Sequence, residues 1–280
     1  MRSRRRVWLY RLAFYAAAYL AYCGMVAWRA DGYIFADHGR ARAVGRTPPS
    51  GEGWEVWRAP LAPGIVGEAW WRPHPQASAE RPAPAVLYFH GNAELIDDNL
   101  EVADLWNGLG ASVLLVEYRG YGRSGGRPRL GTLAEGAAVW FDRLAARPDV
   151  AADRIVAHGF SLGGAVAARL SLDRPLAGLV LESTFASLPR MARTLGVWLY
   201  LPRERLDSMA ALRVLPAGVP VVISHGRADP VIPVKEGRAL AAARPSATYY
   251  ETDGEHLPWS ASAVARAGLA TVLAQPDRPD

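Results

Sequence analysis

The chain has 280 residues, half of them hydrophobic and 21% charged, which suits one large domain with a full hydrophobic core or two small ones. This composition excludes a disordered tail, a collagen-like repeat and a disulfide-stapled miniprotein. The net charge of +5 comes from the first eleven residues, which carry five arginines and no acidic residue; no basic stripe with interleaved aromatic residues follows, so nucleic acid is not an expected partner.

The N-terminal segment predicts a membrane anchor over residues 1–30. Residues 12–28 form an uncharged run of 17 residues between the arginines and Arg29. Roughly 17 to 25 apolar residues span a bilayer, and residues 7–10 extend the run if the Arg11 side chain reaches the headgroups. A cleaved signal peptide and an interfacial or buried helix are the alternatives, but no convincing small-residue cleavage site follows the run.

The charges around this run predict which side of the membrane the rest of the chain occupies. The preceding segment is basic without acids, whereas residues 29–46 mix four arginines with Asp31 and Asp37. The positive-inside tendency therefore places the N-terminus in the cytoplasm. A single lysine against 31 arginines is typical of a GC-rich bacterial genome. We expect a single-pass protein of the bacterial inner membrane with its folded domain on the periplasmic side.

Residues 31–52 are expected to be a linker and residues 53–280 the folded domain. In that domain short apolar runs alternate with helical patterns, which predicts an α/β fold with a mostly parallel, doubly wound sheet. The predicted parallel strands are 85–89, 112–118, 154–160, 176–183, 219–225 and 247–251, and the helices are 93–109, 131–146, 162–172, 234–243 and 259–273. Residues 53–59 and 64–71 would add an antiparallel edge. The alternation fails over residues 184–215, which predicts an inserted helical cap.

A candidate nucleophile follows the third parallel strand. The sequence Gly159-Phe160-Ser161-Leu162-Gly163 matches the G-x-S-x-G pattern, in which the glycines let a strand turn sharply into a helix and hold the serine at the tip. The match lies between an apolar strand and a small-residue helix, which is the context that such a turn requires. Ser161 is therefore predicted to be the nucleophile, and an ordinary strand-to-helix turn is the alternative.

A serine hydroxyl needs a base to take its proton and an acid to orient that base. Asp229 follows one buried strand and His256 follows the next, so both loops open at the sheet edge that carries Ser161. We predict Ser161 as nucleophile, Asp229 as orienting acid and His256 as base. The alternative is that Asp229 and His256 are ordinary surface-loop residues. Glu182, at the end of the preceding strand, is the substitute acid, and Glu255 is a poorer one.

Among the other histidines, His90 is expected to belong to the site. It opens the sequence His90-Gly91-Asn92 directly after a strand, where the loop must bring a backbone N–H toward the oxyanion of a tetrahedral intermediate. The predicted oxyanion-hole donors are the backbone N–H groups of Asn92 and Leu162, with the Asn92 side chain as a brace of the loop. The histidines expected to be structural are His38, His74, His158 and His225.

These motifs resemble the α/β-hydrolase superfamily over roughly residues 54–275. The resemblance rests on Leu87-Tyr88-Phe89-His90-Gly91-Asn92-Ala93, Tyr118-Arg119-Gly120-Tyr121-Gly122-x-Ser124, His158-Gly159-Phe160-Ser161-Leu162-Gly163-Gly164 and His225-Gly226-x-x-Asp229. They are most similar to membrane-anchored α/β-hydrolase-domain proteins, often described as serine-aminopeptidase-like, whose eukaryotic relatives include protein depalmitoylases. The resemblance implies the same triad. Glu94 is a departure, because glycine is expected after the HGNA sequence.

The leading hypothesis is a serine hydrolase that cleaves carboxylic esters or thioesters, small or lipid-like, through an acyl-enzyme. This chemistry needs neither a metal nor an organic cofactor, and none is expected. Cys23 is the only cysteine, and no Cys/His cluster has the spacing of a structural zinc site. The alternatives are peptide-bond hydrolysis, suggested by the family description, and a non-catalytic membrane-tethered scaffold. A decayed scaffold would be expected to lose one of the three triad residues, and all three are present.

The predicted cap carries apolar residues at helical spacing over residues 184–202. They are Phe185, Leu188, Met191, Leu195, Trp198 and Leu199. One interpretation is that this face packs on the sheet. The other is that part of it covers the site beside Ser161, in which case Leu195 and Trp198 would bind the acyl chain of a substrate.

Overall fold

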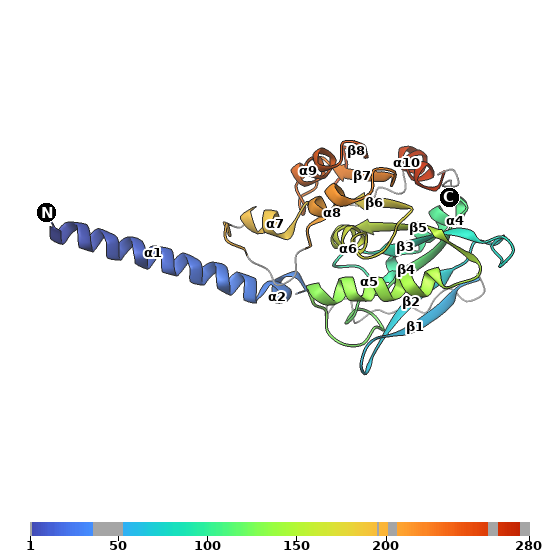
Figure 1. The fold of residues 1–280 in the computed structure, drawn as a ribbon, viewed down its shortest axis with the longest axis horizontal. Coiled ribbons are helices and arrows are strands. Elements are labelled where there is room, and N and C mark those ends of the chain that lie inside the picture. Colours follow the sequence, from blue (N-terminus) through green and yellow to red (C-terminus); the bar gives the residue numbers. More distant parts are fainter. Residues whose placement is uncertain (1, 36–52, 195, 201–205, 257–262, 275–280) are drawn as a thin grey trace.

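The computed structural model describes residues 2–35, 53–194, 196–200, 206–256 and 263–274. Within these ranges the chain forms an eight-stranded sheet with helices on both faces, and one long helix projects away from this body (Figure 1). The strand order is β1-β2-β4-β3-β5-β6-β7-β8. Such an order, with crossovers through helices, is that of a doubly wound α/β fold.

The sheet is parallel except at one edge. The parallel strands are β3 (Ala83–Phe89), β4 (Ser112–Val116), β5 (Val150–Phe160), β6 (Gly178–Glu182), β7 (Val221–Gly226) and β8 (Thr248–Thr252). At the edge, β1 (Glu55–Ala62) and β2 (Ile65–Arg72) form a hairpin, and β2 pairs antiparallel with β4. The predicted sheet and its antiparallel edge are confirmed. β5 begins earlier than predicted because Val150 pairs with Ala83.

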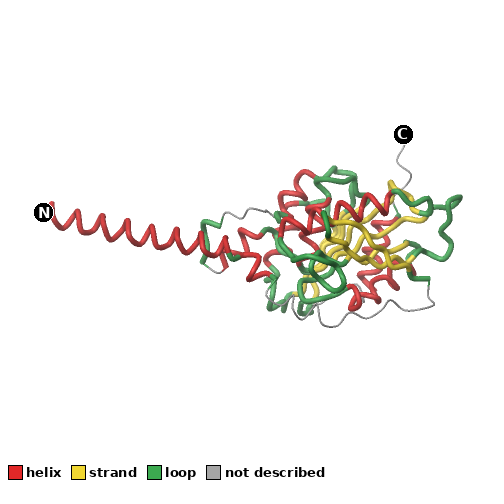
Figure 2. The backbone as a smooth tube through the Cα atoms, turned by 90° about the horizontal axis from the view of Figure 1, so that it is seen from below, coloured by secondary structure: helices red, strands yellow, loops and turns green. Residues whose placement is uncertain are grey.

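Helices cover both faces of the sheet, as Figure 2 also shows. One face carries α5 (Leu130–Ala145), α6 (Leu162–Leu170) and α9 (Lys235–Ala243), and the other carries η1 (Ile96–Asn99), α4 (Leu100–Gly108) and α10 (Ala263–Leu273). Alternate residues of each central strand enter the two hydrophobic cores. In β5, for example, Ala157 belongs to the first core and Val156 to the second. The burial of both faces explains the unbroken apolar strands.

The insertion between β6 and β7 contains less helix than the sequence predicts. It contains α7 (Leu188–Thr194) and α8 (Ser208–Val214). The single apolar face expected through Leu199 is wrong, because α7 ends at Thr194 and Gly196 takes a left-handed conformation with φ of 76°. Leu188 is buried in the core, whereas Leu199 is exposed.

The N-terminal segment forms α1 (Arg2–Trp28) and the short α2 (Ala30–Ile34). Residues Arg5–Trp28 are, by length and composition, long and apolar enough to cross a membrane. The predicted boundary between anchor and linker differs from the structure, because residues 31–35 pack on the domain. The Leu130 N–H donates to the Asp31 carboxylate at 3.1 Å, and the Phe35 ring contacts the Tyr121 ring edge-on. The rest of the predicted linker lies outside the described residues.

Candidate active site

Ser161 lies at the tip of a tight turn between β5 and α6. Its backbone has φ of 55° and ψ of −118°, a conformation that non-glycine residues rarely adopt. Its N–H donates to the Glu182 carbonyl at 2.8 Å, which fixes the turn against β6. A Cβ atom on Gly159 would collide with the Gly163 carbonyl, and one on Gly163 would collide with the Phe89 carbonyl. The two glycines of the pattern are therefore required by close backbone packing.

The structure brings Ser161, His256 and Asp229 together. The His256 Nε2 atom lies 3.0 Å from the Ser161 Oγ atom, and the His256 Nδ1 atom lies 2.7 Å from an Asp229 carboxylate oxygen. The other Asp229 oxygen accepts the N–H groups of Val231 and Ile232, both at 2.8 Å. Asp229 is thus a turn residue and a partner of His256 at once. With Nδ1 donating to the carboxylate, Nε2 is left to accept the serine proton.

The His256 ring is positioned by packing as well as by hydrogen bonding. It lies against the Phe160 ring, with the ring centroids 5.0 Å apart. The His256 side chain is 16% exposed and that of Asp229 is fully buried. The base is therefore reachable from solvent while its acid is shielded, which strengthens the interaction between them.

Glu182, the substitute acid, is committed elsewhere. Its carboxylate lies 2.9 Å from the His158 Nε2 atom, and both side chains are fully buried. The remaining nitrogen of His158 accepts the indole N–H of Trp106 at 2.9 Å. His158 has the structural role that the sequence predicts. Glu255, the poorer candidate, has no bond to His256 among the contacts of the described residues.

The predicted oxyanion-hole donors come from two adjacent backbone segments. Leu162 is the first residue of α6, so its N–H has no acceptor within the helix. The loop after β3 lies directly against the start of α6, since the Gly163 Cα packs on the carbonyls of Phe89 and His90. Asn92 follows in that loop and is partly buried. The two segments are thus adjacent, while the role of their N–H groups stays a prediction.

The Asn92 side chain braces this loop through partners that sequence reasoning missed. Its Oδ1 atom accepts the Tyr121 hydroxyl at 2.7 Å, and its Nδ2 atom donates to the Ile34 carbonyl at 2.5 Å. The Tyr118 hydroxyl donates to the His90 carbonyl at 2.7 Å. Burial raises the pKa of both tyrosines, so their hydroxyls stay protonated and keep donating. The two tyrosines of the YRGYG motif were the sequence signal for this part of the brace. No sequence pattern indicated that α2 would contact Asn92.

His90 forms a buried ion pair with Glu117 beneath the same loop. Its Nε2 atom lies 2.9 Å from the Glu117 carboxylate, and its Nδ1 atom lies 2.7 Å from the Gly91 carbonyl. Burial lowers the pKa of His90, but the charge and the hydrogen bond of Glu117 outweigh this effect, so the pKa is raised overall. Both ring nitrogens face acceptor oxygens, which suits the doubly protonated imidazolium. This ring supports the loop and has no nitrogen left for a substrate.

Glu94, the departure from the expected motif, also supports the loop. Its carboxylate accepts the Gly91 N–H at 2.6 Å. Burial raises the pKa of this carboxyl, and the hydrogen bond from the Gly91 N–H and the nearby charge of His90 oppose the rise. At the position where glycine is expected, the Glu94 side chain thus holds the backbone of the loop by accepting the Gly91 N–H.

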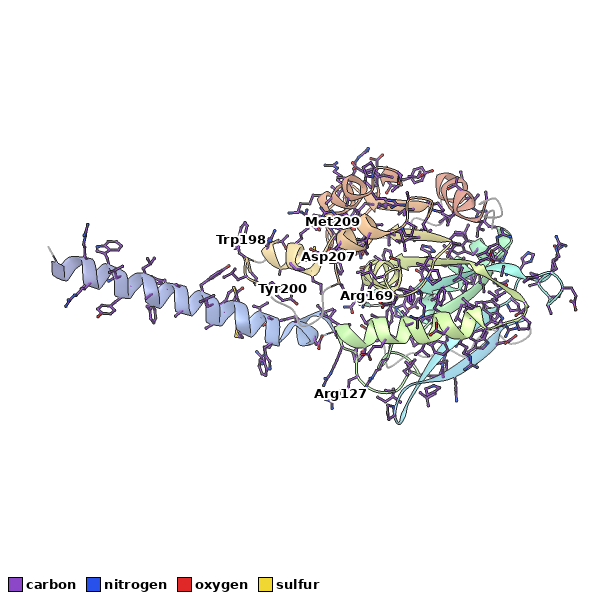
Figure 3. All side chains as sticks on the ribbon, in the orientation of Figure 1. Arg127, Arg169, Trp198, Tyr200, Asp207 and Met209 are labelled. Atoms are coloured by element: carbon purple, nitrogen blue, oxygen red, sulfur yellow. The ribbon has the colours of Figure 1, made fainter. Side chains whose placement is uncertain are left out.

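Of the two predicted substrate-binding residues, Trp198 is not brought to Ser161. The other, Leu195, lies outside the described residues. Trp198 is 67% exposed and projects from the outer end of the cap beside α1 (Figure 3). Its backbone N–H donates to the Tyr19 hydroxyl of α1. Among the described residues no group of three or more His, Cys, Asp or Glu side chains is placed to hold a metal ion.

Comparison with known proteins agrees with this architecture. The family model described as serine aminopeptidase, S33, matches residues 80–218. An uncharacterized Mycobacterium tuberculosis protein is 39% identical over 175 residues, which cover 62% of this chain and 61% of that protein. The chain belongs to the α/β-hydrolase superfamily. The match spans less than two thirds of this relative's length.

Two solved structures show the same α/β-hydrolase fold. The α/β hydrolase from Vibrio vulnificus has a TM-score of 0.67 and 20% identity, and the match covers 86% of this chain and 90% of that one. An esterase from Pyrococcus furiosus has a TM-score of 0.62 and 19% identity, with 83% of this chain and 94% of that one covered. At these identities the likeness concerns the fold alone.

Proposed function

We propose that this α/β hydrolase is a serine hydrolase that cleaves carboxylic esters or thioesters through an acyl-enzyme. The observation that carries the proposal is the chain of contacts from the Ser161 hydroxyl through His256 to the Asp229 carboxylate. An exposed hydroxyl alone is a poor nucleophile, but a hydroxyl bonded to an imidazole whose other nitrogen donates to a buried carboxylate is an activated one.

The geometry suggests the following course of reaction. The Ser161 oxygen attacks the carbonyl carbon while His256 takes the hydroxyl proton. The N–H groups of Leu162 and Asn92 stabilise the oxyanion of the tetrahedral intermediate. His256 then gives the proton to the leaving alcohol or thiol, and the acyl group stays on the serine. A water molecule, deprotonated by His256, attacks this acyl-enzyme; the resulting intermediate releases the acid and restores the serine.

An ester or thioester substrate is supported by the esterase among the structures of the same fold. The description of the matching family model favours peptide-bond hydrolysis instead. A fluorophosphonate probe followed by matched substrates separates these possibilities. We expect the probe to label the wild type but not Ser161→Ala, and turnover of acyl esters and thioesters to exceed turnover of the corresponding aminoacyl amides. Absence of labelling in a correctly folded wild type would support the scaffold alternative.

We further propose that α1 anchors the hydrolase in a membrane, with the folded domain on the non-cytoplasmic side. The length and hydropathy of Arg5–Trp28 support the anchor, and the arginines before it support the orientation. An alkaline wash of membranes should leave the full chain in the pellet. Protease added to sealed inverted vesicles should then leave the domain intact, whereas digestion of the domain would reverse the orientation.

A further inference from the structure

The C-terminal third of α1 packs on the cap and the domain, whereas the part before it is exposed on all sides. Every described side chain from Arg5 to Ala18 is exposed. From Tyr19 onward one stripe of the helix contacts the domain: Cys23 is 2% exposed, and Ala27 packs against the core. The spacing of four residues between these positions is that of one helix face.

The free part of α1 is too short to cross a bilayer by itself. From Arg5 to Ala18 the helix is about 21 Å long at a rise of 1.5 Å per residue. The hydrocarbon core of a bilayer is about 30 Å thick, and a tilted helix needs still more residues. If α1 spans the membrane, lipid must therefore surround at least the next turns of the helix, which include Tyr19 and the part of the cap bonded to it.

That part of the cap is a loop, residues 196–200, with two of its apolar side chains turned outward. Trp198 is 67% exposed and Leu199 is 51% exposed, although Val197 and Tyr200 on either side of them are buried. Figure 3 shows Trp198 at the outer end of the cap, next to α1. Two adjacent large apolar side chains at a protein tip are unfavourable in water and favourable in lipid.

Two backbone polar groups of this loop have hydrogen-bond partners inside the protein, as an apolar environment requires. The Tyr19 hydroxyl donates to the Gly196 carbonyl at 3.1 Å and accepts the Trp198 N–H at 2.9 Å. Irregular backbone at membrane depth is tolerated only where its polar groups find partners in the protein. One hydroxyl of α1 supplies a partner to both of these backbone groups.

We infer that the cap loop, residues 196–200, enters the lipid together with α1, with Trp198 and Leu199 in contact with acyl chains. This inference rests on the proposed anchoring by α1. It also places the site next to the bilayer, because α2 continues from α1 and its Ile34 carbonyl holds the Asn92 side chain. A hydrolase held in this way takes substrates whose acyl chains lie in the membrane.

Site-directed nitroxide labels test the depth of the loop in the full chain reconstituted into phosphatidylcholine vesicles. Labels are attached at Leu199→Cys in a Cys23→Ser background. Leu12→Cys on α1 is the reference for lipid, and Leu172→Cys is the matched control, because Leu172 is 46% exposed in the turn after α6. We expect the labels at positions 199 and 12 to be accessible to oxygen and shielded from a water-soluble nickel chelate, with the reverse at position 172.

The possible outcomes distinguish the loop inference from the anchor proposal. A label at position 199 as water-accessible as that at 172, with position 12 in lipid, overturns the inference and leaves the anchor intact. Water accessibility at position 12 as well overturns the anchor proposal. Neither reading depends on turnover, so failure of the hydrolase proposal would be seen separately in fluorophosphonate labelling.

A second measurement uses the double variant Trp198→Ser/Leu199→Ser. Turnover of an ester embedded in vesicles should fall on the order of tenfold, because the loss of two membrane-inserted side chains weakens the seating of the site on lipid. Turnover of a water-soluble acetate ester should change less than about twofold. Equal losses on both substrates would instead assign these residues a structural role, and no loss on either would overturn the inference.

Discussion

Two histidine–carboxylate pairs in this protein differ in one contact. His256 and Asp229 are 2.7 Å apart, and His158 and Glu182 are 2.9 Å apart. The free nitrogen of His256 faces the Ser161 hydroxyl, whereas that of His158 accepts an indole N–H from Trp106. The side chain of His256 is 16% exposed and that of His158 is fully buried.

The comparison shows that an acid beside an imidazole is not by itself a catalytic feature. The pair stabilises the protein wherever both ring nitrogens have partners inside it, as in His158 and in the His90–Glu117 pair. It can act as a base only where the second nitrogen faces a nucleophile that a substrate can reach. Replacements in the two pairs should therefore affect different properties.

The largest expected difference is between His256→Ala and His158→Ala. Without its base, the first variant should lose turnover by roughly 10⁵-fold with little change in stability. The second leaves Glu182 buried without its imidazole, which should lower the free energy of unfolding by about 3–5 kcal/mol. Ester kinetics and thermal unfolding measured on both proteins check this. A His256 variant that unfolds early but keeps its turnover would reverse the assignment.

The acids of the two pairs provide the next comparison. Asp229→Asn should reduce kcat by about 10⁴-fold, because the amide no longer favours the tautomer with a free Nε2 atom. Glu182→Gln keeps an acceptor for His158 and should change kcat less than about tenfold, with the cost appearing in stability. The two kcat values, measured at saturating ester, decide the comparison. Equal losses, or a larger loss at Glu182, would mean that the orienting acid is assigned to the wrong residue.

Sequence reasoning could propose Asp229 over Glu182 only from the order of the strands. Both acids lie at or just after the ends of buried strands at the same sheet edge, and a strand directs alternate side chains to opposite faces. The end of a strand therefore does not tell which face its acid enters. Glu182 lies within β6 and meets His158 below the turn, whereas Asp229 lies in the loop beyond β7 and meets His256.

The fold was more predictable than the supports of the site. Buried apolar strands are encoded locally, so the sheet and the helices around it were correct in type and order. The bond from Asn92 to Ile34 joins residues that lie 58 positions apart, and neither has a pattern that points to the other. The cap helix predicted through Leu199 was wrong, because helical spacing alone cannot show that Gly196 turns the chain before Trp198.

The third pair, His90–Glu117, should appear in the pH dependence of stability. The pKa of His90 is raised in the folded protein, so its stabilisation is complete below the unfolded value of about 6.5 and is lost as pH rises through the folded value. The free energy of unfolding should therefore fall with pH above about 6.5, by less than about 1.4 kcal/mol per pH unit for one group. Denaturant unfolding from pH 6 to 9 should show this slope in the wild type and lack it in His90→Asn. The same slope in both proteins would contradict the assignment.

The smallest expected effect concerns Glu94, a carboxylate near His256 that bonds to backbone and not to an imidazole. It accepts the Gly91 N–H one residue before Asn92, so we assign it as a positioning residue for the oxyanion loop. Glu94→Ala should lower kcat by roughly three- to tenfold with little change in KM, because a displaced donor matters most in the transition state. Glu94→Gln retains an oxygen acceptor and should stay close to wild type. If Ala and Gln variants lose activity equally, the charge of Glu94 matters and not its bond to Gly91; if KM alone rises, the side chain contacts substrate instead.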